Sequence, residues 1–484
     1  MLINLEYVPA TDTSFPFAPA SDVCGFSECG YMEDEYFMHG SANVYSENDK
    51  GLEVIYKDAP YTTRILIRRP EAIEKFSGNV IIEILNATAM MDIDRMWVNS
   101  WKYFTRNGDI YVGITSKGHV VDSLLKFDKE RYQSICWNNP LPDRQIPDAL
   151  ASGPFPFLPQ YESGLFWDML TDLAKLLRMK SDFNPIAKYG VNYLYLTGWS
   201  QSGSYLVRYL KSFSYLPENC KEHPLFDGYL AAGCGADIAP MNAYEPIKSD
   251  FFRAKGIPKG SVMGAKEPYI NINTESENRH TNWYGDFDQP DYKFRSYPIP
   301  GSSHDSYYNL IEYYNKQKGK ERLVRFTFDG VDGEPLNYPY EFIFNAAFRN
   351  LYAWVRYGVS APHAEKIKTE VVDREHAEPL GAYIRNCTDA FGNAIGGIRT
   401  PAIDYPVGCY ESFSKTKDGR INPMFGKVNP FPPEVLKGIY GDIDNYRRLV
   451  SKRTDEIIAE GFILAEDREE CIEEVVKLAK MRGL

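Results

Sequence analysis

The sequence contains no long apolar run. No stretch of about 18 apolar residues, the length that crosses a bilayer, occurs anywhere in it. Its opening segment, MLINLEYVPATDTSFPF, also lacks the basic and apolar regions that make up a secretory signal. We therefore expect a cytoplasmic protein that does not associate with membranes.

Clusters of basic residues are absent as well. The formal net charge is −12 and the isoelectric point is near 5.3. Nucleic acids and anionic membrane surfaces bind proteins through concentrated Lys and Arg. The charge therefore argues against both as main partners.

The sequence also lacks the spacings that hold metals and cofactors. Its eight cysteines form no pair of Cys-x-x-Cys motifs and have no flanking His pair, and the closest two, Cys24 and Cys29, are spaced unlike zinc ligands. Gly-Cys-Gly at 233–235 lacks the third glycine of a dinucleotide-binding turn. We expect reduced, mostly buried thiols, no metal and no cofactor.

Short apolar segments that alternate with helical patterns dominate the middle of the chain. This alternation is typical of an α/β fold with a mostly parallel central sheet flanked by helices. Two earlier segments, LEVIY and TTRILIRR, predict an antiparallel pair that enters the sheet. The predicted sheet strands are residues 79–85, 109–115, 192–198, 226–233, 268–274 and 294–301.

Two regions, residues 117–165 and the C-terminal region, interrupt the alternation of strands and helices. Residues 117–165 are rich in Pro and aromatics, too long for a plain connection and too apolar for a flexible linker, which predicts a packed insertion. We divide the chain into an N-terminal arm (1–45), a core (46–357) and a C-terminal region (358–484) that packs on the core as a cap or lid.

The segment LYLTGWSQSGSYLVRYLKSF places Ser200 between an apolar strand and a helical pattern. A nucleophile elbow has this context, because small residues two before and two after the serine let the backbone turn sharply and expose Oγ. Gly198 and Ser202 are those small residues. Ser202 replaces the usual second glycine, and Gly203 follows one place later, so a helix N-cap is the alternative interpretation.

Candidate partners for Ser200 follow in the order acid, then histidine. EPYININTESEN is an apolar strand that ends in Glu275 and Glu277, and FRSYPIPGSSHD is a strand that ends near His304. A serine needs an imidazole to take its proton, and a carboxylate to orient that imidazole. The usual spacing between the start of such a strand and the triad acid favours Glu277 as the acid, with Glu275 as the alternative.

Acyl transfer also needs two backbone N–H groups aimed at the developing oxyanion. We assign one to Gln201, which follows the predicted nucleophile at the positive end of a helix. The other belongs to the loop after the strand 79–85, at Asn86 or Ala87. His119 follows the strand 109–115 and either lines the pocket or is an ordinary loop histidine.

Seven stretches together resemble a large, poorly characterised α/β-hydrolase-domain family with a Ser-Gln-Ser-Gly elbow. They are GYMEDEYFMHGSANVY, YTTRILIRRP, FSGNVIIEILN, GWSQSG, TESE, PGSSHD and GNAIGGIRTPAIDYPVGCY. The resemblance implies an α/β-hydrolase fold and a triad of Ser200, an acid and His304. It implies no substrate and no role for GGIRTP, and Glu277 stands where such proteins more often carry Asp.

The sequence thus predicts a serine hydrolase that cleaves carboxylic esters through an acyl-enzyme. The aromatic content of 14% and the Pro-rich insertion suggest a small-molecule ester with a hydrophobic or aromatic group. An amidase or peptidase and an acyltransferase are alternatives that use the same triad. A ligand-binding module on a hydrolase scaffold is the alternative that is not an enzyme.

Overall fold

The computed structural model describes every residue except 49, 148–156, 222, 235–238, 245–264, 279–284, 324, 329–330, 374, 376–383 and 423. The chain forms two compact units, one of residues 1–267 with 314–325 and one of residues 268–313 with 326–484. The three-part division expected from the sequence remains a prediction, and residues 148–156 of the expected insertion lie outside the described residues.

The first unit is built on strands in the order β1-β2-β3-β5-β4-β6-β7. Strands β4, β5, β6 and β7 are mutually parallel, whereas β1, β2 and β3 run antiparallel to their neighbours. Every residue of β4 and β5 is buried, as expected for strands covered by helices on both faces. The strands are β1 Leu2–Val8, β2 Tyr31–Asn48, β3 Gly51–Pro70, β4 Asn79–Ile84, β5 Ile110–Ile114, β6 Tyr193–Trp199 and β7 Gly228–Ala232.

Helices of the first unit pack against these strands. Helices α3 and α8 pack on β6, and α7 packs on β2. The α-helices are α1 Ser21–Cys24, α2 Phe26–Cys29, α3 Arg95–Asn107, α4 Val121–Phe127, α5 Lys129–Tyr132, α7 Phe166–Arg178 and α8 Gln201–Ser212.

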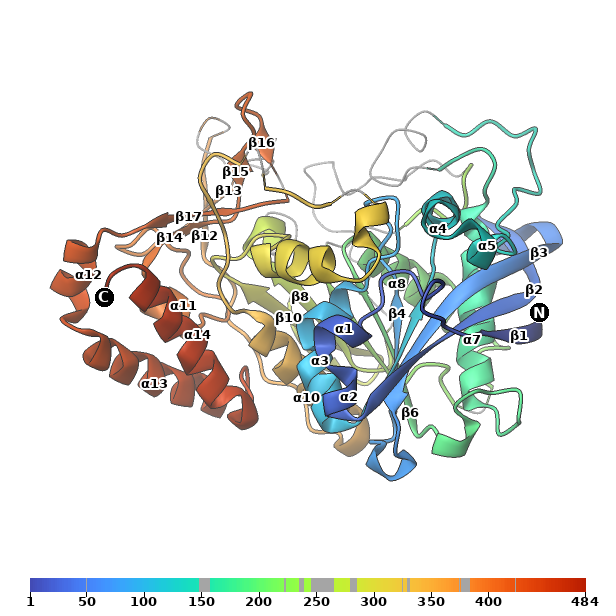
Figure 1. Cartoon of the computed structure of the whole chain (residues 1–484), viewed down its shortest axis with the longest axis horizontal. Helices are drawn as coiled ribbons and strands as arrows, with labels where there is room; N and C mark the ends of the chain where they lie inside the picture. The colour runs from blue at the N-terminus through green and yellow to red at the C-terminus, as the bar shows by residue number, and fades with distance from the viewer. Residues whose placement is uncertain are drawn as a thin grey trace. The chain divides into compact units, whose positions relative to one another are not determined.

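The predicted antiparallel pair formed by LEVIY and TTRILIRR is wrong. Both segments belong to the one long strand β3, whose partner β2 runs beside it (Figure 1). The KDAP segment between them resembles a turn, but it forms a bulge: the pairing moves from Ala42–Ala59 to Val44–Tyr56, and Asp58 takes φ 57°. The two apolar segments are therefore joined by a bulge within one continuous strand and not by a turn.

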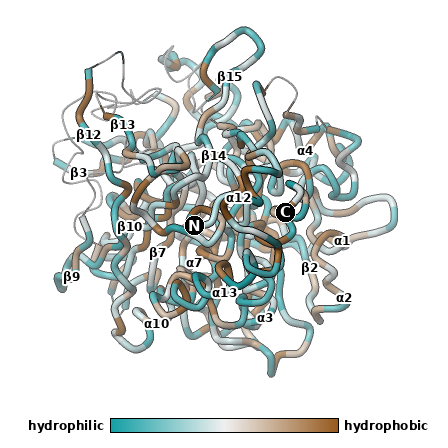
Figure 2. Tube along the Cα trace, turned by 90° about the vertical axis from the view of Figure 1, so that its left-hand side faces the viewer, coloured by the Kyte–Doolittle hydropathy of each residue, from teal (hydrophilic) through white to brown (hydrophobic). Residues whose placement is uncertain are grey.

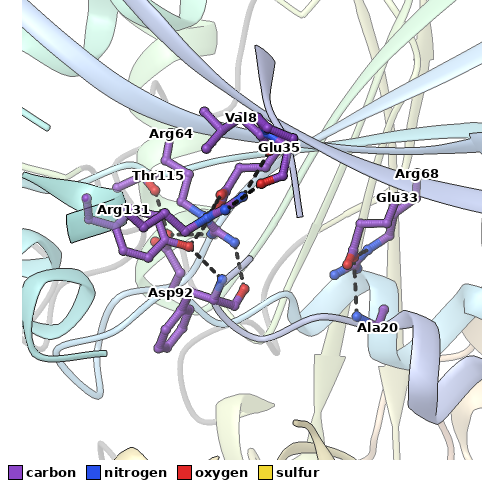
Figure 3. A network of polar contacts seen from close by, with 12 residues as sticks. Val8, Ala20, Glu33, Glu35, Arg64, Arg68, Asp92, Thr115 and Arg131 are labelled. Atoms are coloured by element: carbon purple, nitrogen blue, oxygen red, sulfur yellow. Dashed lines mark hydrogen bonds and ion pairs between the residues drawn. The ribbon is translucent and has the colours of Figure 1, made fainter. Parts of the chain in front are cut away.

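Buried ion pairs tie the start of the chain to this sheet (Figure 3). The Arg64 guanidinium on β3 contacts Glu35 and donates to Asp92 Oδ2 at 3.0 Å. Arg131 Nε donates to the other oxygen of Glu35 at 2.6 Å. Asp92 also accepts a hydrogen bond from Thr115, at the end of β5. The network therefore reaches the loop that follows β5.

The second unit contains a three-strand segment and most of the later helices. Strand β10 pairs in parallel with β8 and antiparallel with β9. These strands are β8 Tyr269–Thr274, β9 Phe287–Gln289 and β10 Tyr292–Ile299. The short strands are β11 Glu334–Pro335, β12 Thr369–Val371, β13 Ile384–Asn386, β14 Gly408–Glu411, β15 Ser414–Lys415, β16 Ile421–Asn422 and β17 Lys427–Pro430.

The C-terminal helices of the second unit are amphipathic. Along α13, the buried residues Tyr446, Val450, Thr454 and Ile457 recur every three or four positions, and hydrophobic and hydrophilic residues alternate along it in Figure 2. This apolar face packs α13 against its neighbours. The helices of this unit are a π-helix Tyr308–Tyr313, α10 Glu341–Tyr357, α11 Pro401–Asp404, α12 Pro433–Tyr440, α13 Ile443–Glu460 and α14 Arg468–Met481.

Candidate active site

Ser200 lies at a strained turn between β6 and α8. Its backbone has φ 57° and ψ −122°, a region that non-glycine residues rarely occupy and that costs roughly 1–3 kcal/mol. The turn is held because the Ser200 N–H donates to Ala232 O at 2.8 Å and its carbonyl accepts from the Ser204 N–H at 3.0 Å. Ser200 is partly exposed, whereas residues 194–199 and 201–210 are buried. The turn therefore leaves Ser200 accessible to solvent while its neighbours in the chain are buried.

Small residues around Ser200 permit this turn. A Cβ on Gly198 would lie 2.6 Å from Ser202 O, and a Cβ on Gly203 would lie 2.5 Å from Cys234 Sγ. Ser202 is tolerated where a glycine is usual because its hydroxyl donates to Leu85 O at 3.0 Å in a buried position. The departure from the usual motif is thus accommodated by a hydrogen bond.

His304 and Glu277 form a buried pair in the second unit. His304 follows β10, and Glu277 ends the single 3₁₀ turn Glu275–Glu277 that follows β8. The two side chains meet with Nδ1 2.7 Å from Glu277 Oε1. Since a carboxylate accepts at Nδ1, the neutral imidazole keeps its lone pair on Nε2, which is the form a general base needs.

Hydrogen bonds hold Glu277 in its ionised form. Burial alone would raise the pKa of this carboxyl, but the charge and hydrogen bond of His304, with hydrogen bonds from Thr274 and Ser276, lower the pKa to about 2. The second carboxylate oxygen accepts from the Thr274 hydroxyl at 2.6 Å and from its N–H at 2.8 Å. The carboxylate is thereby fixed in one orientation toward the ring.

Glu275 has different contacts. Its carboxylate accepts from the Gly301 N–H at 2.6 Å and from Asn386 Nδ2 at 3.1 Å. These bonds link the turn after β8 to the turn after β10 and to β13. The geometry therefore favours Glu277 over Glu275 as the partner of His304.

The two candidate oxyanion donors in the loop after β4, Asn86 and Ala87, differ in the direction of their N–H groups. The Asn86 N–H donates to Ile93 O at 2.9 Å, so it is engaged within the loop. The Asn86 carbonyl accepts from the Ile93 N–H, also at 2.9 Å. In a trans peptide the next N–H points away from that carbonyl, so the Ala87 N–H is directed to the opposite side. Ala87, the alternative from the sequence, is therefore the better candidate.

Asn86 instead connects the loop to the elbow. Its Nδ2 donates to Trp199 O at 2.9 Å, and its Oδ1 accepts from the Thr88 N–H at 3.0 Å. Gln201, the other predicted donor, is the first residue of α8, where the partial positive charge of the helix N-terminus lies. The structure thus brings Gln201, Asn86 and Ala87 around the turn that carries Ser200.

Two residues that follow β5, His119 and Lys117, contact the loop after β4 and the first turn of α8, respectively. His119 is buried, and its Nε2 donates to Ala87 O at 2.9 Å, so it is not an ordinary loop histidine. Lys117 is buried too and contacts Ser202, a role that no motif in the sequence predicted. Its place at the carboxyl end of a strand next to β4 was the available signal.

A strand, a sharp turn that carries a serine, and a helix follow one another here, which is the local context of a nucleophile elbow. The sequence matches the alpha/beta hydrolase domain family over residues 5–473, and the chain belongs to this family. The predicted α/β-hydrolase fold is thereby confirmed. Comparison with curated proteins gives no match. None of the described helices combines the length and apolarity that a bilayer-spanning segment needs.

Several solved structures resemble the chain distantly. Esterase Est22 is 12% identical over 53% of this chain and 67% of its own, with a TM-score of 0.28. A fungal esterase from Rhizomucor miehei is 9% identical over 58% and 79%, with a TM-score of 0.31. An alpha-beta serine hydrolase homologue from Coxiella burnetii is 11% identical over 56% and 93%, with a TM-score of 0.26. Likenesses this low carry no conclusion about activity.

Proposed function

We propose that the protein is a serine hydrolase that cleaves carboxylic esters through an acyl-enzyme on Ser200. The observation that carries the proposal is the strained, partly exposed serine at the start of α8, in a chain that also holds an ionised Glu277 against His304. Strain of this kind concentrates at functional sites, because the surrounding structure must maintain it.

In the proposed mechanism, His304 Nε2 takes the proton of Ser200 Oγ as the oxygen attacks the ester carbonyl. Glu277 keeps the proton of the ring on Nδ1 and stabilises the imidazolium that forms. The N–H groups of Gln201 and Ala87 stabilise the oxyanion, and each such donor contributes about 10²–10³-fold in rate. His304 then protonates the leaving alcohol, and water releases the acid by the reverse sequence.

The substrate we infer is a small ester with a hydrophobic or aromatic group. None of the eight cysteines, all of them among the described residues, is in a disulfide, which fits the cytoplasmic location that we infer. Amide hydrolysis and acyl transfer to an alcohol use the same groups, so products decide among them. Binding without turnover would identify a ligand-binding module instead.

Labelling with a fluorophosphonate, followed by mass mapping of the modified peptide, tests the proposal. We expect modification at Ser200, and hydrolysis of nitrophenyl esters that falls by at least about 10³-fold in Ser200→Ala and in His304→Ala. Ser212→Ala is the matched control, because Ser212 is also partly exposed and lies at the other end of α8. A folded protein that neither labels nor turns over any ester or amide would contradict a hydrolase.

A further inference from the structure

The loop after β5 places two polar side chains, Ser116 and Lys117, in the protein interior next to the first turn of α8. Ser116 is fully buried and Lys117 is 1% exposed. Lys117 Nζ lies 2.7 Å from Ser116 Oγ and 3.4 Å from Ser202 Oγ. A lysine is almost never buried unless its amine has partners, so this contact set requires an explanation.

The direction of each hydrogen bond in this cluster is fixed by Leu85 O. Ser116 Oγ donates to this carbonyl at 2.6 Å and Ser202 Oγ donates to it at 3.0 Å. Each hydroxyl has a single proton, so both must accept from Lys117 Nζ. The amine also lies 4.1 Å from the centre of the Tyr205 ring, whose face attracts N–H groups. Lys117 is therefore a donor to both hydroxyls.

This role does not depend on the charge of the amine. Burial lowers the pKa of Lys117 well below its ordinary value, while the charge of Asp92 opposes that shift. Asp92 is itself held by Arg64 and Thr115, at the edge of the buried ion network (Figure 3). A neutral amine still has two N–H groups, which is the number that the two hydroxyls accept.

Leu85 and Ser202, which this cluster connects, lie next to the two parts of the proposed catalytic site in the first unit: the oxyanion loop and the turn that carries Ser200. Leu85 directly precedes Asn86 and Ala87, the oxyanion loop, and Ser202 lies in the first turn of α8, two residues after Ser200. His119 supports the same loop, because Nε2 donates to Ala87 O. The loop after β5 therefore contacts both the oxyanion loop and the nucleophile helix.

We propose that Lys117 is a positioning residue, which through Ser116 and Ser202 holds the Ala87 N–H in register with Ser200 Oγ. The inference rests on the proposed function. Catalytic groups must be held within about 0.5 Å of the productive geometry, and residues behind them provide that precision. Since the oxyanion forms only in the transition state, displacing its donor lowers kcat and leaves substrate binding little changed.

Lys117→Met tests the inference because it keeps the length of the side chain and removes the donors. We expect kcat for a nitrophenyl ester to fall about 10–100-fold and KM to change less than about threefold. The rate at which fluorophosphonate labels Ser200 should fall in parallel. Lys188→Met is the matched control: Lys188 is exposed and also lies over a tyrosine ring, at 5.9 Å, and its loss should leave both rates unchanged.

Ser116→Ala and Ser202→Ala provide a second reading if Lys117→Met does not fold. Each removes one acceptor and one bridge to Leu85 O, and each should lower kcat about 3–30-fold without a matching change in KM. A folded Lys117→Met with the kcat of the wild type, or both serine variants at that kcat, overturns the inference while the proposed function stands. Wild-type protein without labelling or turnover overturns the proposed function and this inference together.

Discussion

At the scale of single residues, Ser200 and Glu277 show how local contacts prepare a group for chemistry. Ser200 keeps a positive φ because strand and helix hydrogen bonds hold it on both sides. Glu277 accepts hydrogen bonds from His304, Ser276 and Thr274, so its carboxylate has little rotational freedom. The Ser200 backbone and the Glu277 carboxylate are thus held in place in the absence of a ligand, and such preorganisation would reduce the reorganisation needed in the proposed reaction.

Substituting the two acids separately tests the proposed role of Glu277. Glu277→Gln should lower kcat by about 10³-fold or more, because an amide no longer selects the Nδ1–H tautomer of His304. Glu275→Gln serves as the matched control, and its ester hydrolysis should stay within about tenfold of the wild type, since Glu275 contacts Gly301 and Asn386. Steady-state ester hydrolysis measures both. A larger loss in Glu275→Gln would reverse the choice of acid.

At the scale of elements, Glu83 joins β4 to the start of α3. Its carboxylate accepts from the Met96 N–H at 2.9 Å and the Trp97 N–H at 3.0 Å, two donors that an α-helix leaves unpaired at its first turn. The Tyr111 hydroxyl donates to it as well, at 2.8 Å. A buried strand residue thus caps the helix that packs beside it.

Glu83→Gln should destabilise this junction. An amide offers one acceptor and one donor to three donors, so at least one buried N–H group loses its partner. We expect the free energy of unfolding to fall by about 1–3 kcal/mol, measured by urea denaturation. Glu53→Gln, at an exposed site on β3, is the control and should change it by less than about 0.5 kcal/mol. Equal stability of both variants would show that the cap contributes nothing.

At the scale of the whole chain, the buried ion network joins segments that are distant in sequence. Glu35 on β2 binds both Arg64 and Arg131, and Arg131 also donates to Pro9 O at 2.9 Å. Arg64 donates to Phe17 O at 2.6 Å. The N-terminal residues are therefore fixed to the sheet by charges that are almost fully buried.

Glu35→Gln should be strongly destabilising, because it leaves two buried guanidinium groups without their shared negative charge. We expect a loss of about 3–5 kcal/mol. Glu370→Gln, in the exposed pair with Arg385, should cost no more than about 1 kcal/mol. Thermal and urea unfolding of the two variants measure the difference. A loss in Glu35→Gln as small as in the control would mean that the network is replaceable.

The sequence by itself determined the fold class and the strands that carry it. The apolar segments around residues 79–85, 109–115 and 192–198 became β4, β5 and β6, because a fully buried parallel strand must be apolar along its length. The small residues around Ser200 likewise predicted the sharp turn, since the close approach of Ser202 and Cys234 excludes larger side chains. These features are local, so local patterns report them. The catalytic roles remain proposals.

Only the tertiary structure decided which partner each polar group takes. The contact of Glu277 with His304 depends on a residue 27 positions later, and the continuity of β3 through KDAP depends on its partner strand β2. The contact of the Asn86 N–H with Ile93 O depends on how its own loop folds back. The buried position of Lys117 depends on Ser202, 85 residues later. Hydrogen-bond partners of this kind are set when the elements pack, and no spacing within one segment encodes them.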